Sequence, residues 1–254
     1  MPASDATTRF SSRVDNYVRY RPGYPSEILD LLRDKCGLTP SAHIADVGFG
    51  TGLFTRLLLE NGNSVAGIEP NAEMRQVGET FLANFPRLRA IQGTAEATTL
   101  TDHSVDFVTA AQAAHWFDRM GARREFQRIL KPGGWVVLLW NERITHSTPF
   151  LVAYEKLLLQ YGTDYAEVRH ERTTEMIGEF FTPSSYEVAT FPMRQTFDLP
   201  ALEGRVFSSS YTPQPGDANY EPLRHELDEL FRRCHTDGQV AFEYWTRVFF
   251  GRLS

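Results

Sequence analysis

Three glycines and one acid form the group of residues most suited to chemistry in this chain. Gly48, Gly50 and Gly52 follow Asp46 at the end of an apolar run, 42–47, and precede a helical pattern. Glycine adopts backbone angles closed to other residues and lets a ligand approach the main chain. The start of the helix adds unpaired amides and a partial positive charge. We predict a strand, a turn and a helix that bind a small polar ligand.

A second acid, Glu69, ends the next predicted strand, 64–68. An acid at this position of a doubly wound sheet accepts two hydrogen bonds from a ribose diol. The usual dinucleotide turn is Gly-x-Gly-x-x-Gly, whereas here an acid precedes the first glycine and the spacing differs. Asp46 disfavours a pyrophosphate at the helix start and suits a cationic amino group, directly or through water. The two acids therefore favour a nucleoside that carries a positive charge.

The pattern Asp-x-Gly-x-Gly-x-Gly resembles the first motif of the class I, Rossmann-like S-adenosylmethionine-dependent methyltransferases. Phe49 departs from that motif, since the family more often has a small residue there. Three later segments match the same family in the same order: 92–96, 106–117 and 130–134. A narrower likeness, at 20–25, 112–118 and 208–213, resembles the small-molecule group that includes trans-aconitate methyltransferase.

This resemblance implies S-adenosyl-L-methionine as the cofactor and a set of residues that contact it. Ala95 and Glu96 would meet the adenine edge, where Glu96 accepts a hydrogen bond from the exocyclic amine. The end of the fourth strand would lie beside the methionine part. The full set of cofactor candidates is Asp46, Gly48, Phe49, Gly50, Gly52, Glu69, Pro70, Met74, Ala95, Glu96, Gln112 and Ala113.

Methyl transfer from a sulfonium is an in-line displacement, so we expect the protein to position the reactants and exclude water. Aromatic faces can stabilise the sulfonium by cation–π attraction. Arg21 can pair with a carboxylate, and the prolines around it hold an extended segment that can cover the pocket. The candidates for binding the acceptor are Tyr17, Tyr20, Arg21, Trp116, Trp140, Asn141 and Tyr211.

His115 is the candidate general base if the acceptor is a hydroxyl group, because a hydroxyl must lose a proton. A carboxylate acceptor is already an anion at neutral pH and needs no base. His115 could equally be a hydrogen-bonded residue that positions the cofactor edge, and Trp116 could simply pack. The residues leave these alternatives open.

Strand and helix patterns alternate up to about residue 141, which predicts a parallel sheet with helices on both faces. The run 135–140 is continuously apolar, as a strand covered on both faces must be. The fold class is therefore α/β, a Rossmann-like doubly wound sheet, mostly parallel, with an antiparallel C-terminal edge strand and a helical cap. The predicted strands are 42–47, 64–68, 88–92, 105–110 and 134–140, and the helices between them are 52–60, 71–84 and 119–130.

The pattern changes after Asn141. A helix ending at Gly162, a polar stretch at 163–175, a strand at 186–191 broken by Pro192, helices at 199–209 and 222–235, and a last strand from Val240 to Phe250 follow. We expect one methyltransferase domain, 1–254, with its core at 26–141, 185–198 and 239–254. The cap comprises 10–25, 145–184 and 199–236, and we expect it to recognise the acceptor.

Composition excludes several other classes. The chain of 254 residues has a net charge of −6, which argues against a nucleic-acid partner. It has no apolar run near the roughly 20 residues of a membrane span, so we expect a cytoplasmic protein with no membrane partner. Its histidines lack metal-ligand spacing, and Cys36 and Cys234 are far apart, so we expect no metal or disulfide. The oligomeric state is open.

Three functions fit the sequence. The first is methyl transfer to a small-molecule acceptor, at a carboxylate or hydroxyl oxygen. The second is an NAD-linked oxidoreductase, against which Asp46 and the glycine spacing argue. The third is a non-catalytic regulatory protein that binds the cofactor.

Overall fold

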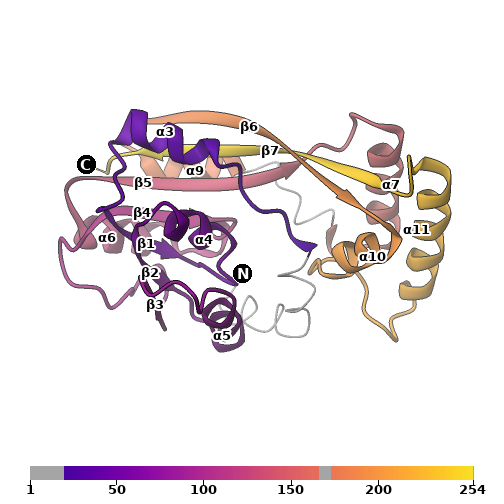
Figure 1. Cartoon of the computed structure of the whole chain (residues 1–254), viewed down its shortest axis with the longest axis horizontal. Coiled ribbons are helices and arrows are strands. Elements are labelled where there is room, and N and C mark those ends of the chain that lie inside the picture. Colours follow the sequence, from indigo (N-terminus) through magenta and orange to yellow (C-terminus); the bar gives the residue numbers. More distant parts are fainter. Residues whose placement is uncertain (1–19, 166–172, 254) are drawn as a thin grey trace.

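A seven-stranded mixed sheet organises the protein in the computed structural model, which describes residues 20–165 and 173–253 (Figure 1). The strand order is β3-β2-β1-β4-β5-β7-β6, with the first five strands parallel and β7 antiparallel to both β5 and β6. The predicted fold class is confirmed. The strands are β1 His43–Val47, β2 Ser64–Ile68, β3 Leu88–Ile91, β4 Val105–Ala111, β5 Leu130–Arg143, β6 Tyr186–Phe197 and β7 Val240–Gly251.

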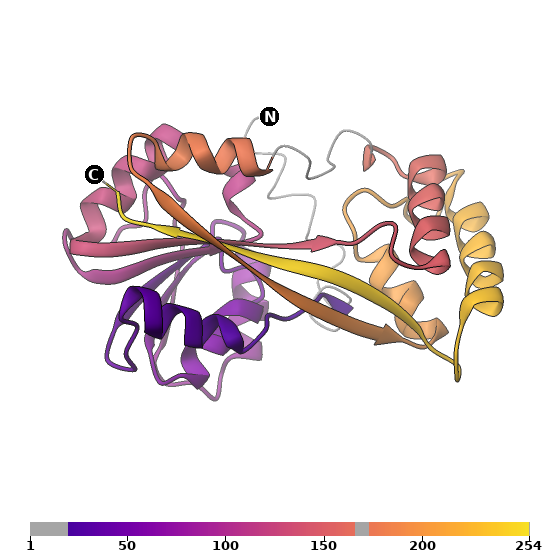
Figure 2. The same ribbon diagram turned by 90° about the horizontal axis from the view of Figure 1, so that it is seen from above.

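Helices cover both faces of the parallel part of the sheet (Figure 2). On one face α3 (Glu27–Cys36) and α4 (Leu53–Glu60) bury their apolar stripes, and Leu82 beyond the end of α5 (Ala72–Phe81) joins them. On the other face α6 (Arg119–Ile129) packs through Ala122, Phe126 and Ile129. Because strands β1, β2 and β4 are parallel, their carboxyl ends meet at one edge, where ligands bind on such sheets.

Three strands continue past the parallel part of the sheet and carry the cap (Figure 1). β5 and β7 stay paired as far as Arg143 and Tyr244, and β6 pairs with β7 along its whole length. The prediction that Pro192 breaks the sixth strand is wrong. Proline lacks only the amide donor, and β6 is an edge strand, so Pro192 is accommodated there.

The cap consists of α7 (Pro149–Tyr161), α10 (Leu199–Phe207) and α11 (Tyr220–Cys234), which share a core with the distal ends of β6 and β7. The helix α9 (Thr173–Phe181) was not predicted, since 163–175 was interpreted as a polar stretch. It lies beside α6, and Ile177, Phe180 and Phe181 enter the core of the sheet. The expected cap range 145–184 therefore includes a helix that belongs to the sheet.

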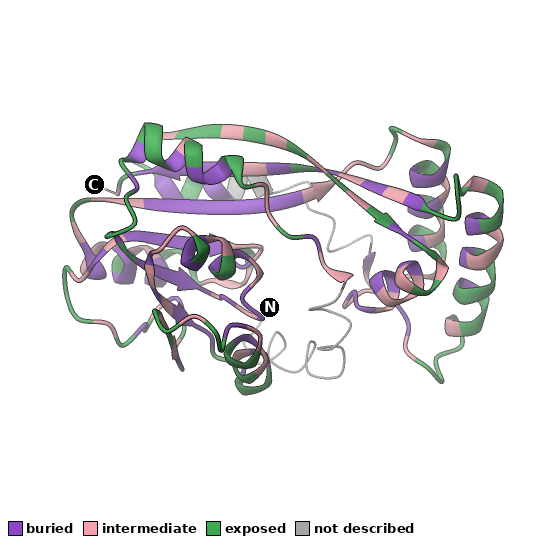
Figure 3. Ribbon diagram, viewed as in Figure 1, coloured by how far each residue is buried: buried purple, intermediate pink, exposed green. Residues whose placement is uncertain are grey.

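Burial divides the molecule in the same way (Figure 3). The purple, buried strands run through the centre of the sheet, while the outer faces of α3, α5 and α11 are exposed. Among the residues that the structure describes, no helix has both the length and the apolarity needed to cross a membrane.

Candidate active site

The predicted glycine turn joins β1 to α4 at the carboxyl edge of the sheet. Gly48, Gly50 and Gly52 have φ angles of 69°, 56° and 86°, the left-handed region that glycine occupies without strain. A Cβ at Gly48 would lie 2.6 Å from the Cβ of Ala113, so the turn rests directly on the end of β4. A Cβ at Gly52 would lie 2.5 Å from Leu82 Cδ1, so this glycine serves packing inside the protein.

Glu69 lies against the same turn. Its Oε2 accepts a hydrogen bond of 3.0 Å from the Gly50 amide, and its Oε1 accepts one of 3.0 Å from the Asn71 amide. Burial raises the pKa of Glu69, and these two donors together with Arg75 oppose the rise. A carboxylate has about four lone-pair sites, so two of them stay open for a ribose diol. The acid and the turn predicted from separate motifs are thus in direct contact.

Asp46 is less accessible than predicted. It is 1% exposed, and its two oxygens accept hydrogen bonds of 2.5 and 2.7 Å from the hydroxyls of Thr55 and Thr109. Burial raises its pKa to about 6, although both threonines favour the charged form. The carboxylate therefore lies beneath the turn, where it ties α4 and β4 to β1. Its negative charge still acts on a ligand above the turn, but the described side chains shield it from direct contact.

Phe49, predicted to contact the cofactor, turns its ring into the protein. The ring is 6% exposed and packs on two glycines, one in β2 and one in α5. A Cβ at Gly67 would lie 2.8 Å from the ring, and a Cβ at Gly78 would lie 2.6 Å from it. These two glycines make room for the large residue at a position where the family has more often a small one. Only the main chain of Phe49 stays in the turn.

The residues after Glu69 have different surroundings. Pro70 is exposed, while Met74 is buried and its methyl carbon lies 3.4 Å from the place of a Cβ at Gly50. The Met74 amide donates a 2.9 Å hydrogen bond to Asn71 Oδ1, which caps the start of α5. Met74 therefore borders the turn from the side of α5.

The end of β4 brings the next group of predicted residues to this edge. Gln112 has a φ of 57°, which costs about 1–3 kcal/mol for a residue with a side chain. Its Nε2 donates a 3.2 Å hydrogen bond to the Asn141 carbonyl of β5. Ala113 is buried against Gly48. The strained backbone thus links the glycine turn to the strand that leads into the cap.

The short helix η2 (Ala114–Trp116) follows directly, with His115 exposed and Trp116 half-buried, their rings 4.8 Å apart. The turn after β3 meets this region: Ala95 is buried, and Glu96 Oε1 accepts a 2.8 Å hydrogen bond from the Asp118 amide. One oxygen of Glu96 thus holds the loop in front of α6.

Of the predicted acceptor-binding residues, Trp140 is misplaced. Successive side chains of a strand point to opposite faces. Trp140 is fully buried on the face of α6 and α9, and its ring lies 6.1 Å from that of Phe249. Asn141 takes the other face, where it donates to the Gly23 carbonyl at 3.0 Å and accepts from Thr246 Oγ1 at 2.6 Å.

The segment before α3 joins the cap to the sheet. The ring of Tyr20 occupies the space where a Cβ at Gly204 of α10 would lie, so it packs on this helix instead of facing a ligand. Arg21 Nη2 donates to the Ser208 carbonyl at 3.3 Å. The rings of Tyr211 and Tyr165 lie 4.9 Å apart and are tilted by 54° to each other. Tyr17 lies outside the described residues.

Sequence reasoning missed two arginines of the cap, Arg143 and Arg205. Arg205 is 4% exposed in a helix, and the Arg143 side chain is 10% exposed at the end of β5. A charged residue at a buried position of the α10 stripe was the available signal. The neighbours of Arg205 include Tyr244 of β7 and Tyr154 of α7, and no sequence spacing predicts that these elements meet.

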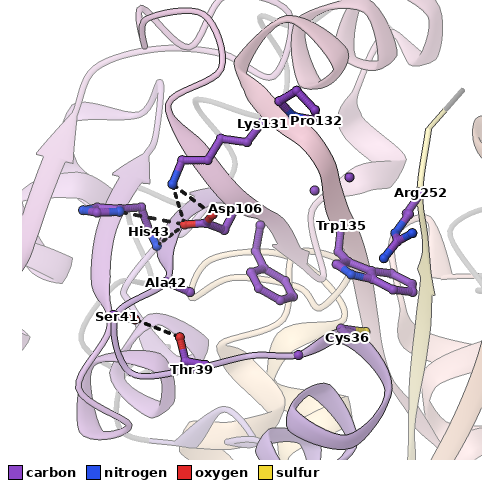
Figure 4. Close-up of a pocket in the computed structure, with 14 residues that line it drawn as sticks. Cys36, Thr39, Ser41, Ala42, His43, Asp106, Lys131, Pro132, Trp135 and Arg252 are labelled. Carbon is purple, nitrogen blue, oxygen red and sulfur yellow. Dashed lines mark hydrogen bonds and ion pairs between the residues drawn. The ribbon is translucent and has the colours of Figure 1, made fainter.

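A surface hollow of about 440 Å³ lies at the opposite, amino edge of the sheet (Figure 4). It is lined by His43, Asp106, Lys131, Trp135 and Arg252, and Lys131 Nζ pairs with both oxygens of Asp106 at 2.9 Å. The guanidinium of Arg252 lies 4.6 Å from the centre of the Trp135 ring, and the glycine turn and Glu69 do not line the hollow. This hollow is therefore separate from the candidate site.

Comparisons with known proteins agree with this geometry. Residues 45–138 match the family described as a methyltransferase domain. An uncharacterized methyltransferase-like protein of Schizosaccharomyces pombe is 29% identical over 94% of this chain and 93% of its own length. An uncharacterized methyltransferase of Mycobacterium tuberculosis is 42% identical, over 55% of this chain and 54% of its own. The chain is an S-adenosylmethionine-dependent methyltransferase.

The fold comparison extends beyond the matched domain. A solved structure of a candidate type II methyltransferase from Anaeromyxobacter dehalogenans superimposes with a TM-score of 0.65 at 20% identity. It covers 92% of this methyltransferase and 98% of its own chain, so the shared fold includes the cap. The alternative of an NAD-linked oxidoreductase is set aside by these matches.

Proposed function

We propose that this methyltransferase binds S-adenosylmethionine along the glycine turn and Glu69, and transfers its methyl group to an oxygen of a small molecule at the cap side. The supporting observation is the contact of Glu69 with Gly50 on one side of the turn and of Ala113 with Gly48 on the other. Three motifs that are distant in the sequence thereby form one ligand-binding edge.

The chemistry of this edge suits such a donor. The open lone pairs of Glu69 accept the ribose hydroxyls. Helix α4 has no side-chain cap at Gly52, so its first amides can donate hydrogen bonds to the carboxylate of the methyl donor. Asp46 and Glu69 supply negative charge near a ligand that carries a sulfonium and an ammonium. A pyrophosphate would meet repulsion from the same acids.

The protein's own part in the reaction is positioning and exclusion of water. Bound there, the donor would supply an electrophilic methyl group, whose bond to sulfur breaks as an acceptor oxygen's electron pair forms the new bond to carbon. The hydrogen bond from Gln112 to the Asn141 carbonyl fixes the end of β4 against β5, and so fixes the proposed donor site relative to the acceptor side. The segment after Arg21 is tied to the same strand, because the Asn141 side chain donates to the Gly23 carbonyl.

The nature of the accepting oxygen decides whether a base is needed. A carboxylate has no proton to lose. A hydroxyl must release its proton, and His115, exposed on η2 directly after Gln112 and Ala113, is the candidate to receive it. Methylation that continues in a His115→Ala variant would support a carboxylate acceptor.

Calorimetry tests the donor, and mass spectrometry tests the transfer. We expect S-adenosylmethionine and S-adenosylhomocysteine to bind and NAD(H) not to bind. A metabolite extract incubated with the enzyme and deuteromethyl donor should yield products with the label on oxygen. No labelled product from the extract, or a label on nitrogen or carbon only, would contradict the proposal.

A further inference from the structure

Three arginines converge at the cap end of the sheet, and we call them the arginine cluster: Arg21, Arg143 and Arg205. Arg143 stands at the end of β5, Arg205 on α10 and Arg21 on the segment before α3. The guanidinium carbons of Arg143 and Arg205 lie 6.0 and 5.7 Å from the centre of the Phe242 ring. Arg21 donates to the carbonyl of Ser208, next to the serine that Arg205 contacts. In agreement with this geometry, burial raises the pKa of Tyr211 but the three arginines lower it.

Among the residues that the structure describes, Arg205 has no carboxylate partner of the kind that a buried guanidinium usually has. Its Nη1 donates to Ser209 Oγ at 3.1 Å and its Nη2 reaches Tyr244 Oη at 3.5 Å, both neutral groups. Its Nε is buried and makes no hydrogen bond to any described residue. Within 20–165 and 173–253, no carboxylate forms an ion pair with it. Burial of a charge without a counter-charge costs free energy.

Arg143 is only partly neutralised. Its Nη2 donates to Glu155 Oε2 at 2.6 Å and to Tyr165 Oη at 2.8 Å. Its Nη1 is buried without a hydrogen-bond partner in the described part of the chain. The guanidinium lies 4.7 Å from the centre of the Tyr154 ring, which orients it as a plane. Among the described residues, Glu155 is thus the one carboxylate that pairs with either Arg143 or Arg205, so positive charge exceeds negative charge at these two buried guanidinium groups.

The arginine cluster lies close enough to the proposed donor site for one small molecule to reach both. Asn141 and Arg143 are two residues apart on β5 and so share a face, about 7 Å from each other at strand spacing. Asn141 in turn receives the Gln112 side chain at the end of β4. Tyr244, paired with Arg143 in register, and Thr246, paired with Asn141, complete this face. A small molecule is long enough to span from the cluster to Gln112.

We infer that the arginine cluster binds an anionic group, a carboxylate or a phosphate, on the methyl acceptor, so that the substrate class is small organic anions. This inference rests on the proposed function. Guanidinium groups donate strong hydrogen bonds to both kinds of anion, and Arg143 Nη1 and Arg205 Nε, which have no hydrogen-bond partner among the described residues, supply one donor each. Arg143 and Arg205 would hold the anionic end while another oxygen of the same molecule accepts the methyl group.

The first test separates acceptors by charge. A metabolite extract is divided by anion exchange into a retained and an unretained pool, and each is incubated with enzyme and deuteromethyl donor. We expect labelled products from the retained pool. Labelled products from the unretained pool alone would overturn this inference and leave the proposed function intact. No label in either pool, or no donor binding by calorimetry, would overturn the proposed function itself.

Phosphatase treatment of the retained pool distinguishes the two anions. Labelling that survives treatment identifies a carboxylate, and labelling that is lost identifies a phosphate ester. Either result supports the cluster as an anion site.

Variants then test the arginines. We expect Arg205→Gln and Arg143→Gln to lower labelling of the dilute retained pool by roughly 30-fold or more, since each removes a charged hydrogen-bond donor. Labelling should recover as the pool is concentrated, with donor affinity within about twofold of wild type. Arg205→Lys, which keeps the charge, should recover part of the loss.

The matched control is Arg224→Gln, an arginine of α11 whose side chain is 51% exposed and pairs with Glu203. It should leave labelling unchanged. If folded Arg205→Gln and Arg143→Gln label the dilute pool as wild type does, or lose donor affinity together with labelling, the arginines are structural and the inference is wrong.

Discussion

The glycine turn and the arginine cluster are built in opposite ways. The turn is made of residues without side chains, set above two buried acids, Asp46 and Glu69. The cluster is made of long charged side chains that come from three distant segments. Their charges are also opposite, negative near the proposed cationic donor and positive near the proposed anionic acceptor. Each region is suited to one reactant, and Gln112 and Asn141 join them.

The opposite charges of the two regions bear on the reaction. Transfer of a methyl group from a sulfonium to a carboxylate oxygen removes the charges of both reacting groups, so surroundings that exclude water favour the products over the separated ions. The anionic group at the arginine cluster is a different part of the acceptor and keeps its charge through the transfer. The turn and the cluster therefore each bind one reactant, and the reacting oxygen lies between them.

The largest predicted effect concerns the packing beneath the glycine turn. Phe49→Ala should lower the free energy of unfolding by about 3–5 kcal/mol, because its ring is buried between Gly67 and Gly78. Urea denaturation measures this. The nearest atoms to a Cβ at Gly67 all belong to Phe49. Adding Gly67→Ala to Phe49→Ala should therefore restore part of the stability, whereas Gly67→Ala alone should destabilise; additive effects would contradict this packing.

The sequence allowed the turn to be predicted much better than the cluster. The order of strands and helices up to β5, the turn and Glu69 follow from local patterns, because each motif specifies its own backbone. Phe49 was assigned to the wrong side, since its direction depends on Gly67 and Gly78, which lie in other elements. Trp140 could have been excluded by strand alternation alone once Asn141 was placed on the ligand side.

The cap was less predictable because its geometry depends on long-range packing. No spacing in the sequence brings Arg205 to Tyr244 or Arg143 to Glu155. The helix α9 was hidden by polar residues next to it, and only its burial against α6 explains its apolar face. Charged residues in buried positions were the remaining local signal of a site.

The second prediction concerns Asp46, the buried acid beneath the glycine turn. Burial raises the pKa of Asp46 to about 6 from 3.8, so the folded protein holds this proton more tightly than the unfolded chain. Its contribution to stability is full below about pH 4 and is lost as the pH rises through 6, on the order of 3 kcal/mol in all. We expect the unfolding free energy of wild type minus that of Asp46→Asn to fall between pH 4 and 7. A difference that does not change with pH would mean that Asp46 is not buried.

A smaller effect is expected at the proposed ribose site. Glu69→Ala should weaken donor binding by about 1–3 kcal/mol, through loss of the diol hydrogen bonds and of the bond to the Gly50 amide. Calorimetry with S-adenosylhomocysteine measures it, and Glu73→Ala, an exposed acid in the first turn of α5, is the control. Labelling of a saturated acceptor pool at saturating donor should change little. If Glu69→Ala and Glu73→Ala behave alike, Glu69 does not bind the donor.

The smallest effect concerns the junction of the two regions. Gln112 has a φ of 57°, so Gln112→Gly relieves strain and should raise the unfolding free energy by about 1 kcal/mol at most. The same variant loses the hydrogen bond to the Asn141 carbonyl, which keeps the turn and the cluster in register. We therefore expect slower methyl transfer with donor affinity unchanged, measured by single-turnover labelling. A variant that is less stable than wild type, or that transfers at the same rate, would show that the strain at Gln112 serves the fold and not the alignment of donor and acceptor.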